Sequence, residues 1–226
     1  VNKNGEENLL GLQYLYDNAL PLKVTGIIRP KEDASSTMLA GNIAYTLALL
    51  NEPSVIYTSV GKDFAEYGQE LTALGISLDG VNTVDDDFTA CAYITSDQAG
   101  NQITGFSPAA MKVPAFPGKT PAVKEGDWAL IGPGNMDDMV NLAAFYRENG
   151  VKYIFDPGQQ ITSMTGEQLV AGFTGATVLI GNDYEIELIG KMTGLDREAL
   201  LDYMEAESDL HYRYSQLAWL YGRQHP

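Results

Sequence analysis

The feature that most constrains the fold is a regular alternation of short apolar runs and amphipathic segments in the second half of the chain. The apolar runs cover residues 128–131, 151–155 and 176–180, and the amphipathic segments cover residues 136–149, 167–173, 184–192 and 196–205. Buried parallel strands are apolar runs, and helices of this length are the usual crossovers between them. The alternation predicts an α/β fold with a mainly parallel sheet covered on both faces.

The first half of the chain is less regular. The pattern predicts strands at 22–28 and 54–60 and helices at 40–50 and 63–74, the second helix closed by Gly75. Residues 88–95 and 101–106 bracket the turn Ser-Asp-Gln-Ala-Gly and predict an antiparallel hairpin. The hairpin and the early strands break the strand–helix rhythm, so we expect them to form a small second sheet at one edge. Four prolines between residues 107 and 126 indicate a surface connection.

Composition narrows the function classes. The chain has 226 residues, a formal net charge of −16, one cysteine (Cys91) and two histidines. A single cysteine excludes an intramolecular disulfide framework and a multi-cysteine zinc site. The acidic balance argues against nucleic acid as a partner, because phosphate neutralisation needs clustered Lys and Arg. The sequence has no run of about 18 apolar residues and no charged-then-apolar leader, so we expect a cytoplasmic protein with no membrane partner.

Two short motifs begin helices and could carry chemistry. Gly41 and Asn42 open the first of these helices, where free N–H groups and an amide side chain could bind hydroxyl groups of a polyol. Asn182 and Glu185 follow an apolar run and lie three residues apart on a first helical turn, where they could orient a hydrated Mg²⁺. Each motif can also be explained as a helix cap, the second as a relative of the capping box.

Glycine-rich turns follow two more of the predicted strands. Asp156-Pro157-Gly158 and the segment at 132–135 both stand where a parallel strand ends, and ligands of open α/β sheets bind at that edge. We interpret them first as turns and second as the lining of a pocket. The sequence has no G-x-x-x-x-G-K-[ST], G-x-G-x-x-G or G-x-S-x-G motif, which argues against P-loop, dinucleotide-binding and α/β-hydrolase functions.

Taken in order, five segments make the chain resemble the ribokinase-like family of sugar and nucleoside kinases, the phosphofructokinase-B type. The segments are AGNIAYTLALL, SVGKDFAEYGQELTALGIS, FTACAYITSDQAGNQITGF, YIFDPGQ and VLIGNDYE. They lie between about residue 38 and residue 200 in the order of the family. NQITGFSPAAM and NDYE are most similar to its adenosine-kinase-like bacterial branch.

The resemblance implies a single three-layer α/β/α domain, residues 1–226, with a small β lid and a shortened C-terminal part. The lid elements would lie within about 9–40 and 86–108, and the core would comprise 40–85 and 109–226. It also implies transfer of the γ-phosphate of ATP to a hydroxymethyl group of a nucleoside or sugar, with Mg²⁺ as the cofactor.

The same resemblance assigns residues to roles. Gly41, Asn42 and Asp17 would bind the acceptor, Asp17 at a poorly matched position near the first strand of the family. Asn182 and Glu185 would bind the nucleotide phosphates, with Glu185 holding Mg²⁺ through water.

The chain departs from the family in ways that bear on catalysis. Thr37 and Met38 replace the paired glycines that precede the acceptor-binding helix, and no G-x-G-D segment is present. That segment supplies the catalytic aspartate and an anion hole, so no residue is named here as the catalytic base. Two functions stay open: a kinase of the family, or a non-catalytic relative that binds a nucleoside, a sugar or a partner subunit.

The last residues form an aromatic stripe at helical spacing, made by Leu210, Tyr214, Leu217 and Tyr221. We expect this stripe either to cover an open sheet edge or to pair with a second copy of the chain in a homodimer.

Overall fold

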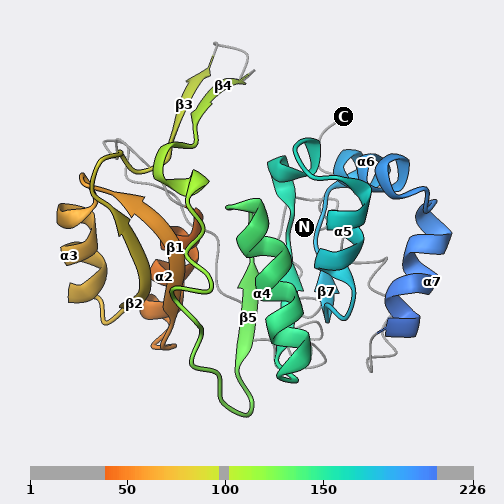
Figure 1. Ribbon diagram of the computed structural model, residues 1–226, viewed down its shortest axis with the longest axis horizontal. Helices are drawn as coiled ribbons and strands as arrows, with labels where there is room; N and C mark the ends of the chain where they lie inside the picture. Colours follow the sequence, from red (N-terminus) through yellow and green to blue (C-terminus); the bar gives the residue numbers. More distant parts are fainter. Residues whose placement is uncertain (1–38, 97–101, 208–226) are drawn as a thin grey trace, which may run out of the picture.

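The computed structural model describes residues 39–96 and 102–207, which form an α/β structure (Figure 1). Its helices and strands are α2 (Leu39–Leu49), β1 (Val55–Gly61), α3 (Ala65–Ala73), β2 (Ser77–Val84), β3 (Cys91–Ser96), β4 (Gln102–Ser107), β5 (Trp128–Ile131), α4 (Met136–Glu148), β6 (Lys152–Phe155), α5 (Gly166–Phe173), β7 (Val178–Leu179), α6 (Asp183–Thr193) and α7 (Arg197–Glu207). Within these residues no helix is long and apolar enough to cross a membrane. The predicted α/β class is confirmed, and the predicted alternation after residue 128 is present element by element.

The second half of the described chain is a three-stranded parallel sheet in the order β5-β6-β7. The crossover helices α4 and α5 pack against each other. Successive right-handed crossovers that move in one direction put their helices on one face, which explains that contact. Tyr153 and Phe155 of β6 are fully buried in the larger core cluster, whereas the alternate residue Lys152 is exposed. Side chains on one face of β6 are therefore buried, as expected from the alternation of side chains along a strand.

The first half has its own sheet and its own core. Strands β1 and β2 pair in parallel and are joined by α3, while α2 packs against β1. Ala44, Ile56, Val60, Phe64, Leu71 and Ile76 form the smaller core cluster. The sequence pattern predicted β1 but not β2. In the described residues the parallel strands form two separate sheets of two and three strands.

The predicted hairpin is confirmed as the antiparallel pair β3–β4, with Ala92 opposite Phe106 and Tyr93 opposite Gly105. It forms a sheet of its own and projects beyond both parallel sheets (Figure 1). The strand expected at 22–28 and the stripe of Leu210 to Tyr221 lie outside the described residues, so both stay predictions.

The proline-rich stretch from residue 107 to 126 is more than the surface connection that its composition predicts. It contains the 3-10 helix η1 (Ala109–Lys112), and Ala110 and Ala115 are buried. The carboxylate of Asp138 on α4 accepts hydrogen bonds from the backbone N–H groups of Ala115, at 2.8 Å, and Phe116, at 2.9 Å. Backbone donors and small buried side chains, together with Phe116 and Val123 that pack against the larger core cluster, hold this stretch in place.

Candidate functional site at the carboxyl edge of the sheet

The ends of three parallel strands meet at one edge of the larger sheet. Strand β5 ends at Ile131, β6 at Phe155 and β7 at Leu179. The ladder runs one residue further, because the Asp156 N–H donates to the Ile131 carbonyl at 2.8 Å and the Ile180 N–H to the Phe155 carbonyl at 2.9 Å. The segments that follow each strand are therefore held side by side, as expected for a binding edge of an open α/β sheet.

Asn182 and Glu185 form a complete capping box at the N-terminus of α6. The Asn182 side-chain oxygen accepts the Glu185 N–H at 2.9 Å, and the Glu185 carboxylate accepts the Asn182 N–H at 2.8 Å. The structural explanation of this pair thus holds, and it also fixes both side chains at the sheet edge. One carboxylate oxygen of Glu185 makes this bond, so the group keeps acceptor capacity for other partners.

Asp156 brings a second carboxyl group to the same edge. The pKa of Asp156 is raised to about 6. Burial is the main cause and the negative charge of Glu185 the second, while a hydrogen bond from the Gly158 backbone acts in the opposite direction. Two carboxylates that repel each other at a strand edge leave a position where a cation is favourable. Asp156 was predicted first as part of a turn and second as part of a pocket lining, and Glu185, whose charge acts on it, lies 29 positions along the chain.

The turns at this edge pack closely on each other. Gly158 has a φ of +43°, and a β-carbon there would lie 2.6 Å from Cγ of Pro133 in the turn after β5. The Gln160 side chain donates to the Gly134 carbonyl at 2.6 Å. The segment at 132–135 leads to Asn135, the N-cap of α4, and Asp156-Pro157-Gly158 leads into the 3-10 helix η2 (Gly158–Thr162), so the two segments change the direction of the chain as predicted and pack against each other.

The structure leaves the other predicted site residues untested. Gly41 and Asn42 are the third and fourth residues of α2, inside the helix and past the position of an N-cap, and their side chains lie outside the described part of the structure. Asp17 lies outside the described residues altogether. The structure therefore brings together Asn182, Glu185 and Asp156, and it leaves the meeting of this group with the acceptor residues as a prediction.

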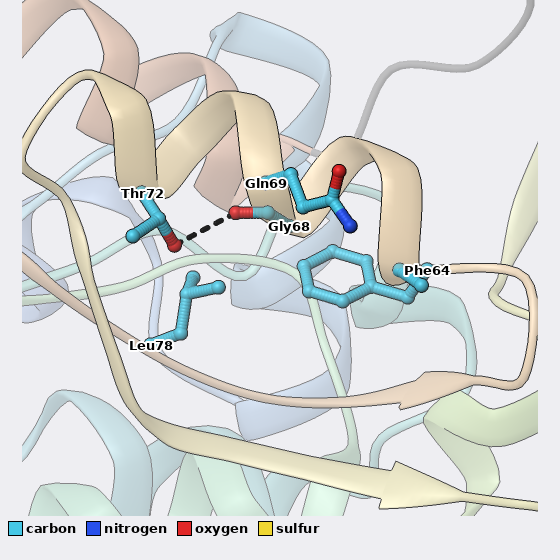
Figure 2. A pocket seen from close by; sticks show the side chains of 6 residues that line it. Phe64, Gly68, Gln69, Thr72 and Leu78 are labelled. Atoms are coloured by element: carbon cyan, nitrogen blue, oxygen red, sulfur yellow. Dashed lines mark hydrogen bonds between the residues drawn. The ribbon is translucent and has the colours of Figure 1, made fainter.

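A groove lies between α3 and β2 (Figure 2). It is lined by Phe64, Ala65, Gly68, Gln69, Thr72 and Leu78. The Thr72 hydroxyl donates to the Gly68 carbonyl at 2.8 Å, inside the helix itself. The lining has no charged side chain that could hold a cation or a phosphate.

The chain is similar to known proteins over most of its length. Residues 40–211 match the model of the pfkB family carbohydrate kinases. A nucleoside kinase of Methanothermobacter thermautotrophicus is 28% identical over 165 residues, which is 71% of this chain and 53% of that protein.

Two solved structures of Burkholderia thailandensis nucleoside kinase are also similar. The complex with inosine is 34% identical with a TM-score of 0.68, and it covers 74% of this chain and 54% of that one. The complex with ADP-inosine is 31% identical with a TM-score of 0.69, and it covers 84% of this chain and 61% of that one. The chain thus spans between half and two thirds of the length of these relatives.

Proposed function

Because this chain belongs to the pfkB family of carbohydrate kinases, we propose that it takes part in ATP-dependent transfer of a phosphoryl group to the hydroxymethyl group of a nucleoside or sugar. The observation that carries the proposal is the Asn182–Glu185 capping box beside the half-buried Asp156 at the strand edge. The similarity to nucleoside kinases, one of them solved with inosine and with ADP-inosine, supports a nucleoside as acceptor and ATP as co-substrate.

The residues at the strand edge fit a hydrated Mg²⁺. Mg²⁺ keeps several waters and takes one or two carboxylates together with substrate phosphates. Among the residues that the structure describes, no three His, Cys, Asp or Glu side chains are grouped to hold a metal, so most ligands of the ion would have to come from water and phosphate. Asp156 and Glu185 would hold the ion, Glu185 through water, and bound Mg²⁺ would neutralise charge on the phosphates.

In this proposal the chain contributes mainly by holding the carboxylates of Glu185 and Asp156 in position. Asn182 fixes the Glu185 carboxylate through the two bonds of the capping box, and the packed turns hold Asp156 beside it. Groups that are held in place before the ligands arrive cost little reorganisation when charge develops in phosphoryl transfer. The β3–β4 hairpin would be the lid that covers the acceptor and keeps water out.

Gly41, Asn42 and Asp17 would bind the hydroxyl groups of the acceptor. Asn42→Ala would remove an amide that can both donate and accept. We expect it to weaken nucleoside binding by about 1–3 kcal/mol, the usual cost of a lost buried hydrogen-bond partner. Calorimetric titration with adenosine or inosine measures the change, and an unaltered affinity would remove Asn42 from the acceptor site.

A second function is favoured by one sequence observation, the absence of a G-x-G-D segment from the 226 residues. A chain without that aspartate and its anion hole would bind a nucleoside, a sugar or a partner subunit without transferring phosphate. The two functions share the same strand edge and differ in turnover alone.

The deciding experiment measures Mg²⁺-dependent release of ADP from ATP with adenosine, inosine, ribose and fructose as acceptors. Acceptor-dependent release supports the kinase and implies a base outside the motifs identified here. No release, together with calorimetric binding of an acceptor, supports the binding protein. The absence of both ADP release and acceptor binding would refute the kinase, and of the second function it would leave only binding of a partner subunit.

A further inference from the structure

The entry into the β3–β4 hairpin is tied to the end of strand β1 by a connected set of hydrogen bonds. Asp63, two residues after β1, accepts the backbone N–H of Thr89 at 2.7 Å and its hydroxyl at 2.8 Å on the same carboxylate oxygen. The Thr89 hydroxyl in turn accepts the N–H of Gly61 at 3.0 Å. Gly61, Thr89 and Asp63 therefore link the strand end directly to the segment that leads into β3.

The backbones at this junction are as close as glycine permits. A β-carbon on Gly61 would lie 2.1 Å from the carbonyl carbon of Phe88 and 2.3 Å from the nitrogen of Thr89, so any other residue would push the two segments apart. The Lys62 N–H also donates to the Asp87 carbonyl at 3.0 Å, and the Ala110 N–H to the Phe88 carbonyl at 2.9 Å. The second bond comes from the chain just after β4, so both ends of the hairpin meet here.

Beyond this junction the hairpin has little other support in the described residues. Strands β3 and β4 pair with each other and with no other described strand. Tyr93 is 67% exposed and Phe106 is 54% exposed, and their register puts them on opposite faces, so both faces are open at this point of the hairpin. An isolated two-stranded hairpin is marginally stable at best in water. Its direction must therefore come from its base.

We propose that Asp63 and Thr89, with Gly61 beneath them, are positioning residues that set the direction of the hairpin over the acceptor. The inference rests on the proposed function, in which the hairpin is the lid. None of the three residues touches the reacting groups. They act through the hairpin, and their effect is on the affinity for the acceptor.

The charge of Asp63 suits this role. Burial raises its pKa, but the two hydrogen bonds from Thr89, a hydrogen bond from the backbone of Asp63 itself and the charge of Lys62 together hold the pKa of Asp63 below its usual value. The carboxylate is therefore ionised at neutral pH, and both bonds from Thr89 are charge-assisted, which makes them stronger than bonds between neutral groups.

The test compares Asp63→Ala, Thr89→Val and the conservative Thr89→Ser. Hydrogen exchange followed by mass spectrometry reads peptides that cover β3 and β4, with β6 as the internal reference. In Asp63→Ala we expect hairpin exchange at least tenfold faster and β6 exchange unchanged. Calorimetric titration of the same variants with adenosine and inosine is expected to show affinity reduced about tenfold, and Thr89→Ser is expected to behave as the wild type in both assays.

The matched control is Asp127→Ala. Asp127 is likewise an exposed aspartate that accepts a backbone N–H, that of Lys124 at 2.8 Å, but it belongs to the loop before β5. We expect it to change neither hairpin exchange nor nucleoside affinity. Equal effects of the two substitutions would assign the result to general destabilisation.

The outcomes separate the inference from the proposed function. If hairpin exchange is unchanged in Asp63→Ala and Thr89→Val, or if β6 exchange is accelerated equally, then Asp63 and Thr89 do not hold the base of the hairpin. Faster hairpin exchange with unaltered nucleoside affinity overturns the positioning role. A wild-type chain that binds neither adenosine nor inosine refutes a nucleoside as the acceptor and the positioning role with it, while the exchange data still decide whether Asp63 and Thr89 hold the base of the hairpin.

Discussion

Removing the charge of Asp156 is expected to stabilise the chain at neutral pH. A pKa that rises from 3.8 to about 6 means that ionising this carboxyl in the folded chain costs about 3 kcal/mol more than in the unfolded chain. The Asp156→Asn side chain carries no charge and can still accept the hydrogen bond from Gly158. Because the site keeps some contact with water, we expect a gain of about 1–3 kcal/mol at pH 7.

The pH dependence gives the sharper test. The folded-state pKa of Asp156 lies above its unfolded value, so the folded chain binds the proton more tightly, and stability is lost as pH rises from about 4 to about 6. Asp156→Asn lacks this loss. The difference in unfolding free energy between variant and wild type should therefore be smallest near pH 4 and reach its full value near pH 7.

Urea unfolding of both proteins across this pH range measures the difference, with Glu185→Gln as the matched control. Gln can keep the capping box through its side-chain oxygen while it removes the charge that helps to raise the pKa of Asp156. We expect a smaller gain from it. With Mg²⁺ and ADP added, the wild type should gain stability and Asp156→Asn should not. A variant no more stable than the wild type at pH 7, with a parallel pH profile, would refute this reasoning.

Two further predictions concern the core. Asp138→Ala leaves the N–H groups of Ala115 and Phe116 without their acceptor and should cost about 2–4 kcal/mol in urea unfolding, whereas Asp138→Asn should cost less. An equal loss of unfolding free energy in both variants would show that the stability does not depend on a side-chain oxygen as the acceptor of these N–H groups. Gly172→Ala would put a β-carbon 2.3 Å from the buried ring of Phe155 and should lower the unfolding free energy by about 1–3 kcal/mol despite the better helix propensity of Ala. A neutral result in the same assay would mean that the ring can move aside.

The alternating half of the fold was predictable because its residues agree with their local structure. Strand β6 is an apolar run with Tyr153 and Phe155 on the buried face, and Gly75 follows α3 with a φ of +79°, as expected after a helix end. Strand β2 was missed for a physical reason. Asp79, Gly80 and Asn82 are poor strand formers, and Gly80 is required there because a β-carbon would lie 2.4 Å from the ring of Tyr57.

The candidate site was predictable only in part. Asn182 and Glu185 lie three residues apart, so their pairing is a local property that the sequence displays. Asp156 stands in Asp-Pro-Gly, which indicates a turn, and its raised pKa arises from burial and from Glu185 on another element. Such an effect exists only once the strands have paired. The acceptor residues Gly41, Asn42 and Asp17 remain predictions from the resemblance.

The two core clusters have a consequence for how the chain acquires its structure. The smaller cluster draws on residues 44–76 and the larger on residues 131–200, so each is filled by one uninterrupted stretch. Among the described residues, the stretch that fills the first cluster is synthesised before the stretch that fills the second, so we expect the first to begin folding earlier. The stretch held by Asp138 lies between the two in the chain, so we expect it to bring them together late in folding.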